Sequence, residues 1–430
     1  MYKTNKNIIA LFVGAIVTIL SISCSGNSSK QKVKESKKIE KAYKYASMKD
    51  GVLHLDLNEA RKHPKKLKLS DICDSLIYIP LETKKECLLG ENMHEIDIDG
   101  DNIFIHEGLK LFYFNINGKF QSQIGKTGRG AGEYVCNGYC LNKRDKKIYA
   151  EACYQHKFLV FDYNDDLLSS ELSFKSHFEG MRYDYINNAI VGSAFYSLSK
   201  NKDAKYYKVK DLKVDNNKIS VFKSNYFPKE YFVDQAKTRM TVVGSSIYSY
   251  KEEIFFQEIV NDTLFKKSDS IMSPHIILNN YKFRPKFTSD KELDIKEFMK
   301  DNDCFFKDFY FSVTDESDRY VFADNIYAKS GHFLFDKKEK ELMFIEKPKE
   351  DNKQIVNNID FVNDCYLGAV INNSYLEIIV DAADLISNYN DMLEAGKLDM
   401  NSKYTKALAK IVNNLTEESN PVIILARLKK

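Results

Sequence analysis

From about Val52 onward, short runs of β-type residues alternate with turn residues along the chain. No amphipathic helix of convincing length interrupts this pattern before the last fifty residues or so. The runs are rich in Tyr, Phe, Ile and Val, which suit a pleated and half-buried surface. The pattern therefore predicts an all-β fold made of many short strands.

The strand pattern also repeats. The segments "DNIFIHEGLKLFYFNINGKF" (Asp101–Phe120) and "KKIYAEACYQHKFLVFDYNDDL" (Lys146–Leu167) share a β-branched and aromatic pair, a polar loop, an aromatic run and a polar turn. Phe114 of the first corresponds to Phe161 of the second, 47 residues later. A third copy, "DNIYAKSGHFLFDKKEKEL", is expected over Asp324–Leu342. A period in the forties with several strands in each unit is typical of β-propeller blades.

The number of blades follows from the length of the repetitive part. Val52 to about Asp381 gives roughly 330 residues, and blades need about 40–50 residues each. Six or seven blades fit, and we expect six. The middle copies are degenerate, because Ile247–Phe265 fits two strands of a blade while Tyr183–Phe222 is only weakly patterned.

The last fifty residues differ from the rest. Helical spacing of apolar residues predicts two short helices within about 382–415, and Gly396 is expected to end the first. The apolar run 421–428 has the length of a strand. We expect this last strand to pair with an N-terminal strand and close the ring of blades, which removes an open sheet edge. The predicted propeller domain, helices included, therefore covers 51–430.

The glycine-rich stretch "IGKTGRGAGEYV" (Ile124–Val135) raises the question of a phosphate-binding loop. A Walker loop needs a glycine where Phe120 stands, and the dinucleotide fingerprint needs a different glycine spacing. The segment that follows is strand-like, so no helix N-terminus is expected to receive a phosphate. We interpret the stretch as a sharp turn between the outer strand of one blade and the inner strand of the next, where glycine takes positive φ at low cost.

The N-terminus is expected to be a targeting segment. Lys3 and Lys6 precede the apolar run Ile8–Leu20, which is too short to span a bilayer and is typical of a signal peptide. Small residues before Cys24 resemble the lipobox of bacterial lipoproteins. We therefore expect a signal peptide over 1–23, lipidation of Cys24 and a solvated tether over 24–50. The resulting location is the cell envelope, on the periplasmic face or the outer membrane.

Several motifs resemble those of a known family. The stretch that starts at Gly128 is similar to the G-x-G-P-G-E-[YF] connector of NHL/TolB-like propellers, with Ala131 in place of proline. The whole chain looks like the uncharacterised six-bladed β-propeller lipoproteins of Bacteroidetes. The supporting segments are "IYIPLET" (Ile77–Thr83), "NDTLF" (Asn261–Phe265), "LFDKKEKEL" (Leu334–Leu342) and "SNPVIILARLK" (Ser419–Lys429). The segment Asn357–Gly368 matches the family's Asn-Asp-Ile-Asp-Gly-Gly pattern only loosely, so any site that it forms in relatives is in doubt here.

Charge and motif content exclude some classes of function. Lys and Arg number 64 against 61 Asp and Glu, so the chain has no electrostatic footprint for nucleic acid. The eight histidines form no H-x-H or H-E-x-x-H pattern, and we expect neither a metal site nor a cofactor. Without Cys24, seven cysteines remain, and most are interpreted as small buried hydrophobes.

The remaining candidates come from geometry. Propellers bind ligands at the loops around the mouth of the central channel. The loops between middle strands, together with the glycine-rich connector, provide the candidate binding residues His106, Lys110, Arg129, Glu133, Tyr154 and His156.

Two classes of function stay open on the sequence. The first is a lipid-anchored binding or scaffold module whose partner is an envelope protein, a glycan or a peptide. The alternative is a propeller hydrolase or lyase with its site at the channel mouth, for which no catalytic residue can be named. An enzyme needs carboxylates, histidines or a metal that converge on the axis, whereas a binding module needs only a polar or aromatic mouth.

Overall fold

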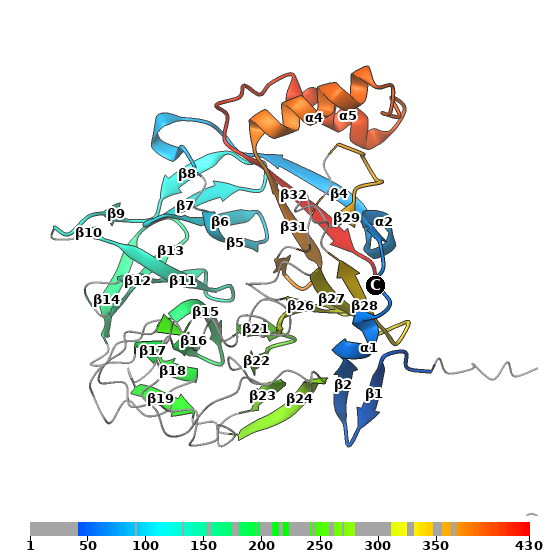
Figure 1. The fold of residues 1–430 in the computed structure, drawn as a ribbon. Coiled ribbons are helices and arrows are strands. Elements are labelled where there is room, and N and C mark those ends of the chain that lie inside the picture. Colours follow the sequence, from blue (N-terminus) through cyan, green and yellow to red (C-terminus); the bar gives the residue numbers. More distant parts are fainter. Residues whose placement is uncertain are drawn as a thin grey trace, which may run out of the picture. The chain divides into compact units, whose positions relative to one another are not determined.

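The computed structural model consists mainly of four-stranded antiparallel sheets (Figure 1). It describes residues 42–90, 93–130, 133–152, 155, 157–173, 180–194, 196–197, 209–214, 218–222, 241–242, 246–257, 262–268, 271–279, 311–324, 331–346, 355–362, 365, 367 and 369–430. Residues 41–430 belong to one compact unit. The expected signal peptide and Cys24 lie outside the described residues.

Six sheets form the blades of a β-propeller, which confirms the predicted fold class and blade number. Blade 1 comprises β5 (Met93–Asp99), β6 (Asn102–Glu107), β7 (Lys110–Asn115) and β8 (Phe120–Gln123). Blade 2 comprises β11 (Cys136–Asn142), β12 (Lys147–Ala152), β13 (Lys157–Asp162) and β14 (Leu167–Ser173). Blade 3 comprises β15 (Gly180–Ile186), β16 (Ala189–Ala194), β18 (Val209–Lys213) and β19 (Lys218–Phe222).

The other three blades complete the ring. Blade 4 comprises β21 (Ser246–Tyr250), β22 (Glu253–Gln257), β23 (Thr263–Ser268) and β24 (Ile271–Asn279). Blade 5 comprises β25 (Ser312–Glu316), β26 (Tyr320–Asp324), β27 (Gly331–Asp336) and β28 (Glu341–Glu346). Blade 6 comprises β30 (Val370–Ile371), β31 (Tyr375–Val380), β32 (Val422–Leu428) and β4 (Cys73–Pro80). In each blade the first strand named is the inner one.

The closing strand is confirmed. In blade 6 the C-terminal strand β32 lies between β31 and the N-terminal strand β4, and it is antiparallel to both. Ile424, for example, lies opposite Ile378 on one side and Tyr78 on the other. The two ends of the propeller sequence are therefore joined in one sheet.

The N-terminal arm, defined as residues 42–68, covers the outer edges of two blades. The hairpin of β1 (Ala46–Lys49) and β2 (Val52–Asp56) extends blade 4 to six strands, with β2 parallel to β24. Helix α1 (Leu57–Arg61) then packs against β28 of blade 5. The short strand β3 (Leu67–Lys68) pairs with β29 (Ile355–Val356) and leads into helix α2 (Leu69–Ile72).

Two sequence expectations are corrected here. The tether was expected to reach residue 50, but 46–49 form β1, because a second strand at that position satisfies the outer edge of β2. The third repeat was expected to begin at Asp324, whereas the second strand of blade 5 is Tyr320–Asp324 and ends there. The sequence Asp-Asn-Ile occurs both at Asp101 and at Asp324, which suggested that the two positions are equivalent. In blade 5, however, the turn at Ser317–Arg319 joins the first strand to the second, so the second strand begins at Tyr320.

The hairpins between inner and second strands follow turn chemistry. Asn187 and Asn188 both have positive φ, 48° and 57°, and they join Ile186 to Ala189 across a two-residue loop. Positive φ at both central positions defines the type I′ turn, whose twist matches that of the strands, and Asn is favoured there. These turns lie at one end of the central channel.

The glycine-rich stretch is a connector, as predicted. It runs from β8 to β11 and contains a parallel pair, β9 (Lys126–Thr127) and β10 (Glu133–Tyr134). Gly125 has a φ of 66°, and a Cβ atom there would lie 2.6 Å from the Tyr134 ring. The backbone N–H of Gly130 donates to the Glu133 carboxylate at 2.9 Å. Strand β11, and not a helix, follows the stretch, and Gly125 and Gly128 allow the positive φ angles that the turn requires.

The C-terminal helices are α4 (Ala382–Glu394) and α5 (Lys403–Val412), within the predicted range. Gly396 ends the first with a φ of 61°. The backbone N–H of Gly396 donates to Leu393, and that of Lys397 donates to Met392, which is the Schellman arrangement. Helix α5 contacts the edge strand β4.

The core of the described residues consists of six apolar clusters, and each joins two neighbouring blades. Phe104 of blade 1 packs with Tyr139 of blade 2, and Phe112 of blade 1 packs with Ile423 of blade 6. The described cysteines are buried, as expected: Cys73, Cys87, Cys136, Cys140 and Cys365. Cys153 and Cys304 lie outside the described residues.

Removal of Pro421–Lys430 is expected to abolish cooperative folding of the propeller. Strand β32 buries Val422, Ile423, Ile424 and Leu425 at 3% exposure or less. Each buried aliphatic side chain contributes about 1.5–3 kcal/mol, so the loss approaches the whole stability of an ordinary domain, about 5–15 kcal/mol. Thermal unfolding of the truncated chain is the measurement. Deletion of Lys429–Lys430 alone is the control, and a truncated chain that melts like the control would contradict the closing role of β32.

Gly125→Ala is expected to destabilise the protein by about 3 kcal/mol, because left-handed backbone costs about 1 kcal/mol and the clash with Tyr134 adds about 2 kcal/mol. Gly100→Ala is the matched control, since its φ is 58° and nothing lies within 4 Å of an added Cβ. The control is expected to lose only about 1 kcal/mol in urea unfolding. Equal losses in the two variants would show that the connector is not tightly packed.

Candidate functional site

A cavity of about 1020 Å³ lies between the inner strands, where the six blades meet. Its size is at the upper end of the range for small-molecule sites, about 300–1,000 Å³. All six blades contribute described residues to its wall. Its polar and charged lining includes Glu95, Asp97, His106, Asn137, Asn142, Lys143, Arg144, Asp184, Asn187, Asn188, Ser249, Glu252, Asp315, Asn372, Asn373 and Glu377.

Three aspartates of this lining occupy equivalent positions in alternate blades. Asp97 of blade 1 lies opposite Phe104, the third residue of the second strand. Asp184 of blade 3 lies opposite Val191, and Asp315 of blade 5 lies opposite Phe322, which are again third residues. Because the blades repeat around one axis, equivalent positions lie at the same level of the channel. The three carboxyl groups therefore form a discontinuous ring, called the aspartate ring below.

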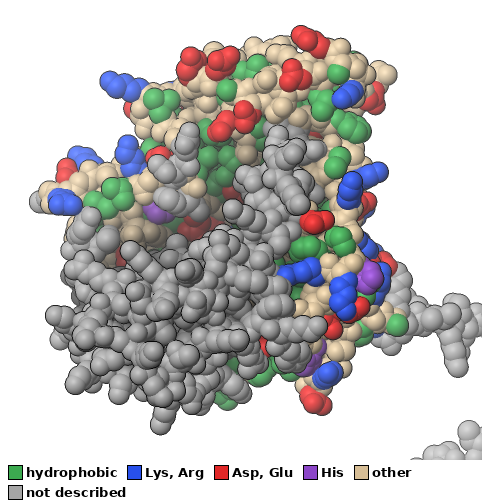
Figure 2. All heavy atoms as spheres, viewed as in Figure 1, with side chains coloured by type: hydrophobic (Ala, Val, Ile, Leu, Met, Phe, Trp, Pro, Cys, Tyr) green, Lys and Arg blue, Asp and Glu red, His purple; other side chains and the backbone are tan. Residues whose placement is uncertain are grey.

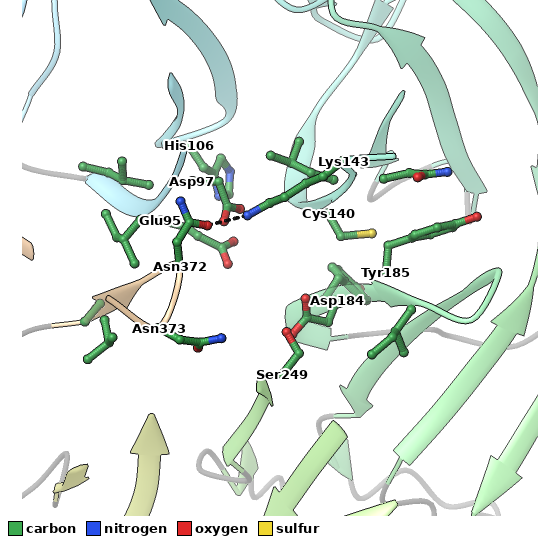
Figure 3. Close-up of a pocket in the computed structure, with 18 of the residues that line it drawn as sticks. Glu95, Asp97, His106, Cys140, Lys143, Asp184, Tyr185, Ser249, Asn372 and Asn373 are labelled. Atoms are coloured by element: carbon green, nitrogen blue, oxygen red, sulfur yellow. Dashed lines mark hydrogen bonds between the residues drawn. The ribbon is translucent and has the colours of Figure 1, made fainter. Parts of the chain in front are cut away.

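The blades between them place other residues at this level. Cys140 of blade 2 lies opposite Tyr149, again a third residue, and lines the cavity. The equivalent residue of blade 4 is Tyr248, opposite Phe255, and it is buried in the core. In blade 6, Val370 lines the cavity and lies opposite Leu376, the second residue of β31. The aspartates are thus separated by uncharged side chains, and Figure 3 shows Asp97 and Asp184 on different sides of the cavity. A ligand that contacts more than one of them has to span the channel.

The cavity wall has an excess of negative charge. Besides the aspartate ring, it contains Glu95, Glu252 and Glu377. Its cationic side chains among the described residues are Lys143 and Arg144, and Arg144 is paired with Asp145 at 3.1 Å. Since charges in a cleft with low-dielectric walls reinforce one another, this wall favours cations over anions.

Lys143 helps to close one end of the channel. Its Nζ donates to the side-chain oxygen of Asn372 at 2.7 Å and to the carbonyl oxygen of Ile98 at 3.3 Å (Figure 3). The Asn372 amide also donates to Ile98, at 2.9 Å. These bonds join blades 1, 2 and 6 through the turns of their inner hairpins. The lysine charge is therefore used to hold the hairpins together.

Among the predicted binding residues that the structure describes, His106 lines the cavity. It is buried, and its Nε2 lies 3.4 Å from the carbonyl oxygen of Cys136 on the next blade. The same fifth position of the second strand has a comparable role elsewhere: Glu151 accepts from the Tyr183 hydroxyl at 2.7 Å, and Gln257 donates to the carbonyl of Phe311 at 3.1 Å. His106 thus belongs to a recurring polar contact between adjacent blades.

The other predicted residues lie elsewhere. Lys110 begins β7, is exposed and lies over the Phe112 ring at 5.8 Å. Arg129 is in the connector, and Glu133 accepts from Gly130 within that turn. Neither is among the residues that line the cavity. Tyr154 and His156 lie outside the described residues.

The segment that resembles the family's Asn-Asp-Ile-Asp-Gly-Gly pattern is structural where it is described. Asp360 is buried and accepts from Asn357, from Tyr78 and from the backbone of Val362. Burial raises the pKa of this carboxyl, against the effect of those donors. Phe361 stands at the first glycine position of the pattern and has a φ of 65°. The segment links blades 5 and 6 through the core and does not line the cavity.

The thiols at the channel are not suited to nucleophilic chemistry. Burial raises the pKa of Cys136 to about 12, and burial likewise raises the pKa of Cys140. Both stay protonated at neutral pH, whereas a nucleophilic cysteine has to ionise. Tyr139 has its pKa raised by burial first and by the nearby carboxyls of Asp97 and Glu95. These groups offer hydrogen bonds and apolar contact.

Sequence reasoning missed the inner-strand acids. It considered the loops between middle strands, but the wall of the cavity comes mainly from inner strands and their hairpins. A signal exists, because the letters "DID", "YDY" and "TDE" each place an aspartate three or four residues before a turn. The three aspartates are recognised as equivalent only when the inner strands are aligned by the residues they pair with on the second strands.

No group of three or more His, Cys, Asp or Glu side chains in the part of the chain that the structure describes is arranged to hold a metal ion. No helix among the described residues is both long and apolar enough to cross a membrane.

A solved structure shares the fold, and a second one resembles it more weakly. A predicted exported protein of Bacteroides fragilis superimposes with a TM-score of 0.58 at 19% identity, over 85% of this chain and 98% of that one. A DUF4221 family member from Bacteroides vulgatus gives a TM-score of 0.46 at 12% identity, over 83% of this chain and 97% of that one. None of the curated proteins matches the sequence significantly.

The family is shown by the sequence itself. A family model described as "Domain of unknown function (DUF4934)" matches residues 52–427, from strand β2 to the last strand β32. This range contains all six blades and the whole described wall of the cavity. The chain therefore belongs to the DUF4934 family.

Proposed function

We propose that the protein is an exported, lipid-anchored binding module that holds a cationic organic ligand, such as a basic peptide segment or a polyamine, in its central cavity. The observation that supports this most directly is the aspartate ring in a cavity of about 1020 Å³. Export and lipidation rest on the apolar run Ile8–Leu20 and on Cys24. The Bacteroides fragilis protein with the same fold is itself predicted to be exported.

The chemistry of the wall favours this ligand class over the other candidates. Six carboxyl groups from five blades line the cavity, against two cationic side chains in its described wall, Lys143 and Arg144, which contact Asn372 and Asp145. Ammonium and guanidinium groups satisfy carboxylates by charge-assisted hydrogen bonds, which are the strongest of their kind. A chain-like ligand with several such groups can contact Asp97, Asp184 and Asp315 together, although they come from different blades.

The triple variant Asp97→Asn, Asp184→Asn, Asp315→Asn tests the proposal. We expect spermine and tetralysine to bind the native chain and to bind this variant about 100-fold more weakly, a loss of about 2.7 kcal/mol. Isothermal titration calorimetry measures the affinities, with tetraglutamate and a neutral oligosaccharide as comparison ligands. Both proteins should be titrated with Cys24→Ser in place, so that the lipid plays no part.

The control variant is Asp166→Asn, Asp384→Asn, Asp391→Asn, which makes the same charge change on exposed positions. It is expected to bind spermine within about threefold of the native chain. Equal losses in both triple variants, or binding of the oligosaccharide without binding of spermine, would refute the role of the aspartate ring. Conversion of tetralysine to smaller products, seen by mass spectrometry, would instead support the hydrolase alternative.

A further inference from the structure

Positive charge is concentrated in one part of the sequence. Residues 30–68 contain 13 Lys and Arg against five Asp and Glu, a net charge of +8, while the whole chain has a net charge of only +3. The remainder of the chain is therefore net negative. This basic segment begins six residues after Cys24 and includes the whole N-terminal arm.

The structure fixes the second half of this segment on one rim of the propeller. Lys44 and Lys65 flank the same carboxylate, Glu341 of blade 5, at 2.6 and 2.8 Å. His63 of the arm stacks on Tyr45, with ring centroids 5.4 Å apart. The arm thus runs along the outer edges of blades 4 and 5, and two of its lysines meet at Glu341.

Other basic residues join this surface from distant parts of the chain. Lys340 of blade 5 lies over the Tyr43 ring at 4.9 Å. Lys338 donates to the backbone of Lys430 at 3.2 Å, which places the C-terminal end at the same rim. Figure 1 shows α1, β28 and the C-terminal end on the same side of the ring. We call this surface the basic rim, and it comprises Lys44, Lys49, Lys62, Lys65, Lys66, Lys68, Lys338, Lys340 and Lys430.

Several lysines of the basic rim are exposed to solvent, while Lys44 and Lys65 also pair with Glu341 and Lys62 pairs with Glu59 at 2.6 Å. The side chains of Lys44 and Lys62 are 53% and 64% exposed, and Lys49, Lys66 and Lys68 are exposed as well. Tyr43 and Tyr45 lie between them and are half-buried. Lysine and tyrosine side chains together are typical of surfaces that lie at a membrane interface, where the ammonium group contacts head groups and the ring lies just beneath them.

We propose that the basic rim docks the propeller onto an anionic membrane surface. Polybasic surfaces gain affinity for anionic lipids in proportion to the number of lysines near the bilayer. The N-terminal part of the rim follows Cys24 in the sequence before any blade does. Of the whole propeller, it is therefore the part separated by the fewest residues from a lipid at Cys24. Docking of this rim leaves the cavity, on the propeller axis, outside the contact.

The proposal is tested with the chain from residue 24 that contains Cys24→Ser, since residues 41–430 form the compact unit and acylation is then absent. Phosphatidylcholine vesicles with about one third phosphatidylglycerol are expected to bind it, and pure phosphatidylcholine vesicles are not. The variant Lys49→Gln, Lys62→Gln, Lys66→Gln is expected to bind the anionic vesicles about 100-fold more weakly, at about fivefold per lysine, in vesicle co-sedimentation at low salt.

The matched control removes three exposed lysines of blade 1 and its neighbouring loops, as Lys85→Gln, Lys110→Gln, Lys126→Gln. It is expected to bind the anionic vesicles within about threefold of the parent chain. Equal weakening by both variants, equal binding to neutral and anionic vesicles, or full competition by inorganic phosphate would overturn the assignment to a membrane surface. Because the rim lies apart from the cavity, the rim variant is expected to keep its affinity for spermine, so this test is independent of the proposed ligand.

Discussion

The structure depends on apolar packing between the faces of adjacent blades. A four-stranded sheet has two faces, and here both are apolar in the core of the ring, so no blade can bury its surface alone. Each of the six described clusters joins two blades, as when Phe104 packs against Tyr139 or Phe112 against Ile423. The blades are therefore stable only as neighbours in a closed ring, and every connection in the chain serves that closure.

Closure leaves outer edges to be satisfied, and the two ends of the chain satisfy several of them. Strand β32 enters blade 6 beside β4, which joins the ends of the propeller in one sheet. The N-terminal arm covers the edges of β24 and β28, and α5 contacts β4. Open strand edges are sites of unwanted pairing, so covering them stabilises the monomer. The same arrangement places the basic arm and the C-terminal end on one rim.

The axis of the ring has the opposite character from the blade interfaces. The inner strands have neighbours on one side only, and their hairpins meet around a cavity. Asp97, Asp184 and Asp315 line this cavity, while the residues opposite them on the second strands are apolar and buried. Lys143 and His106 also help to assemble this wall, by bonds to neighbouring blades.

The sequence by itself determined the features that depend on local pattern. Strand periodicity and the repeat gave six blades, the apolar run after Pro421 gave the closing strand, and the spacing around Gly125 identified a turn. These follow from backbone geometry and burial within a few residues. Of the four predicted binding residues that the structure describes, His106 lines the cavity, while Lys110, Arg129 and Glu133 do not. Only the tertiary structure decided the aspartate ring and the basic rim. Ring closure brings Asp97, Asp184 and Asp315 to one cavity although they are 87 and 131 positions apart in the sequence. It also places the N-terminal arm beside blade 5 and the C-terminal residue.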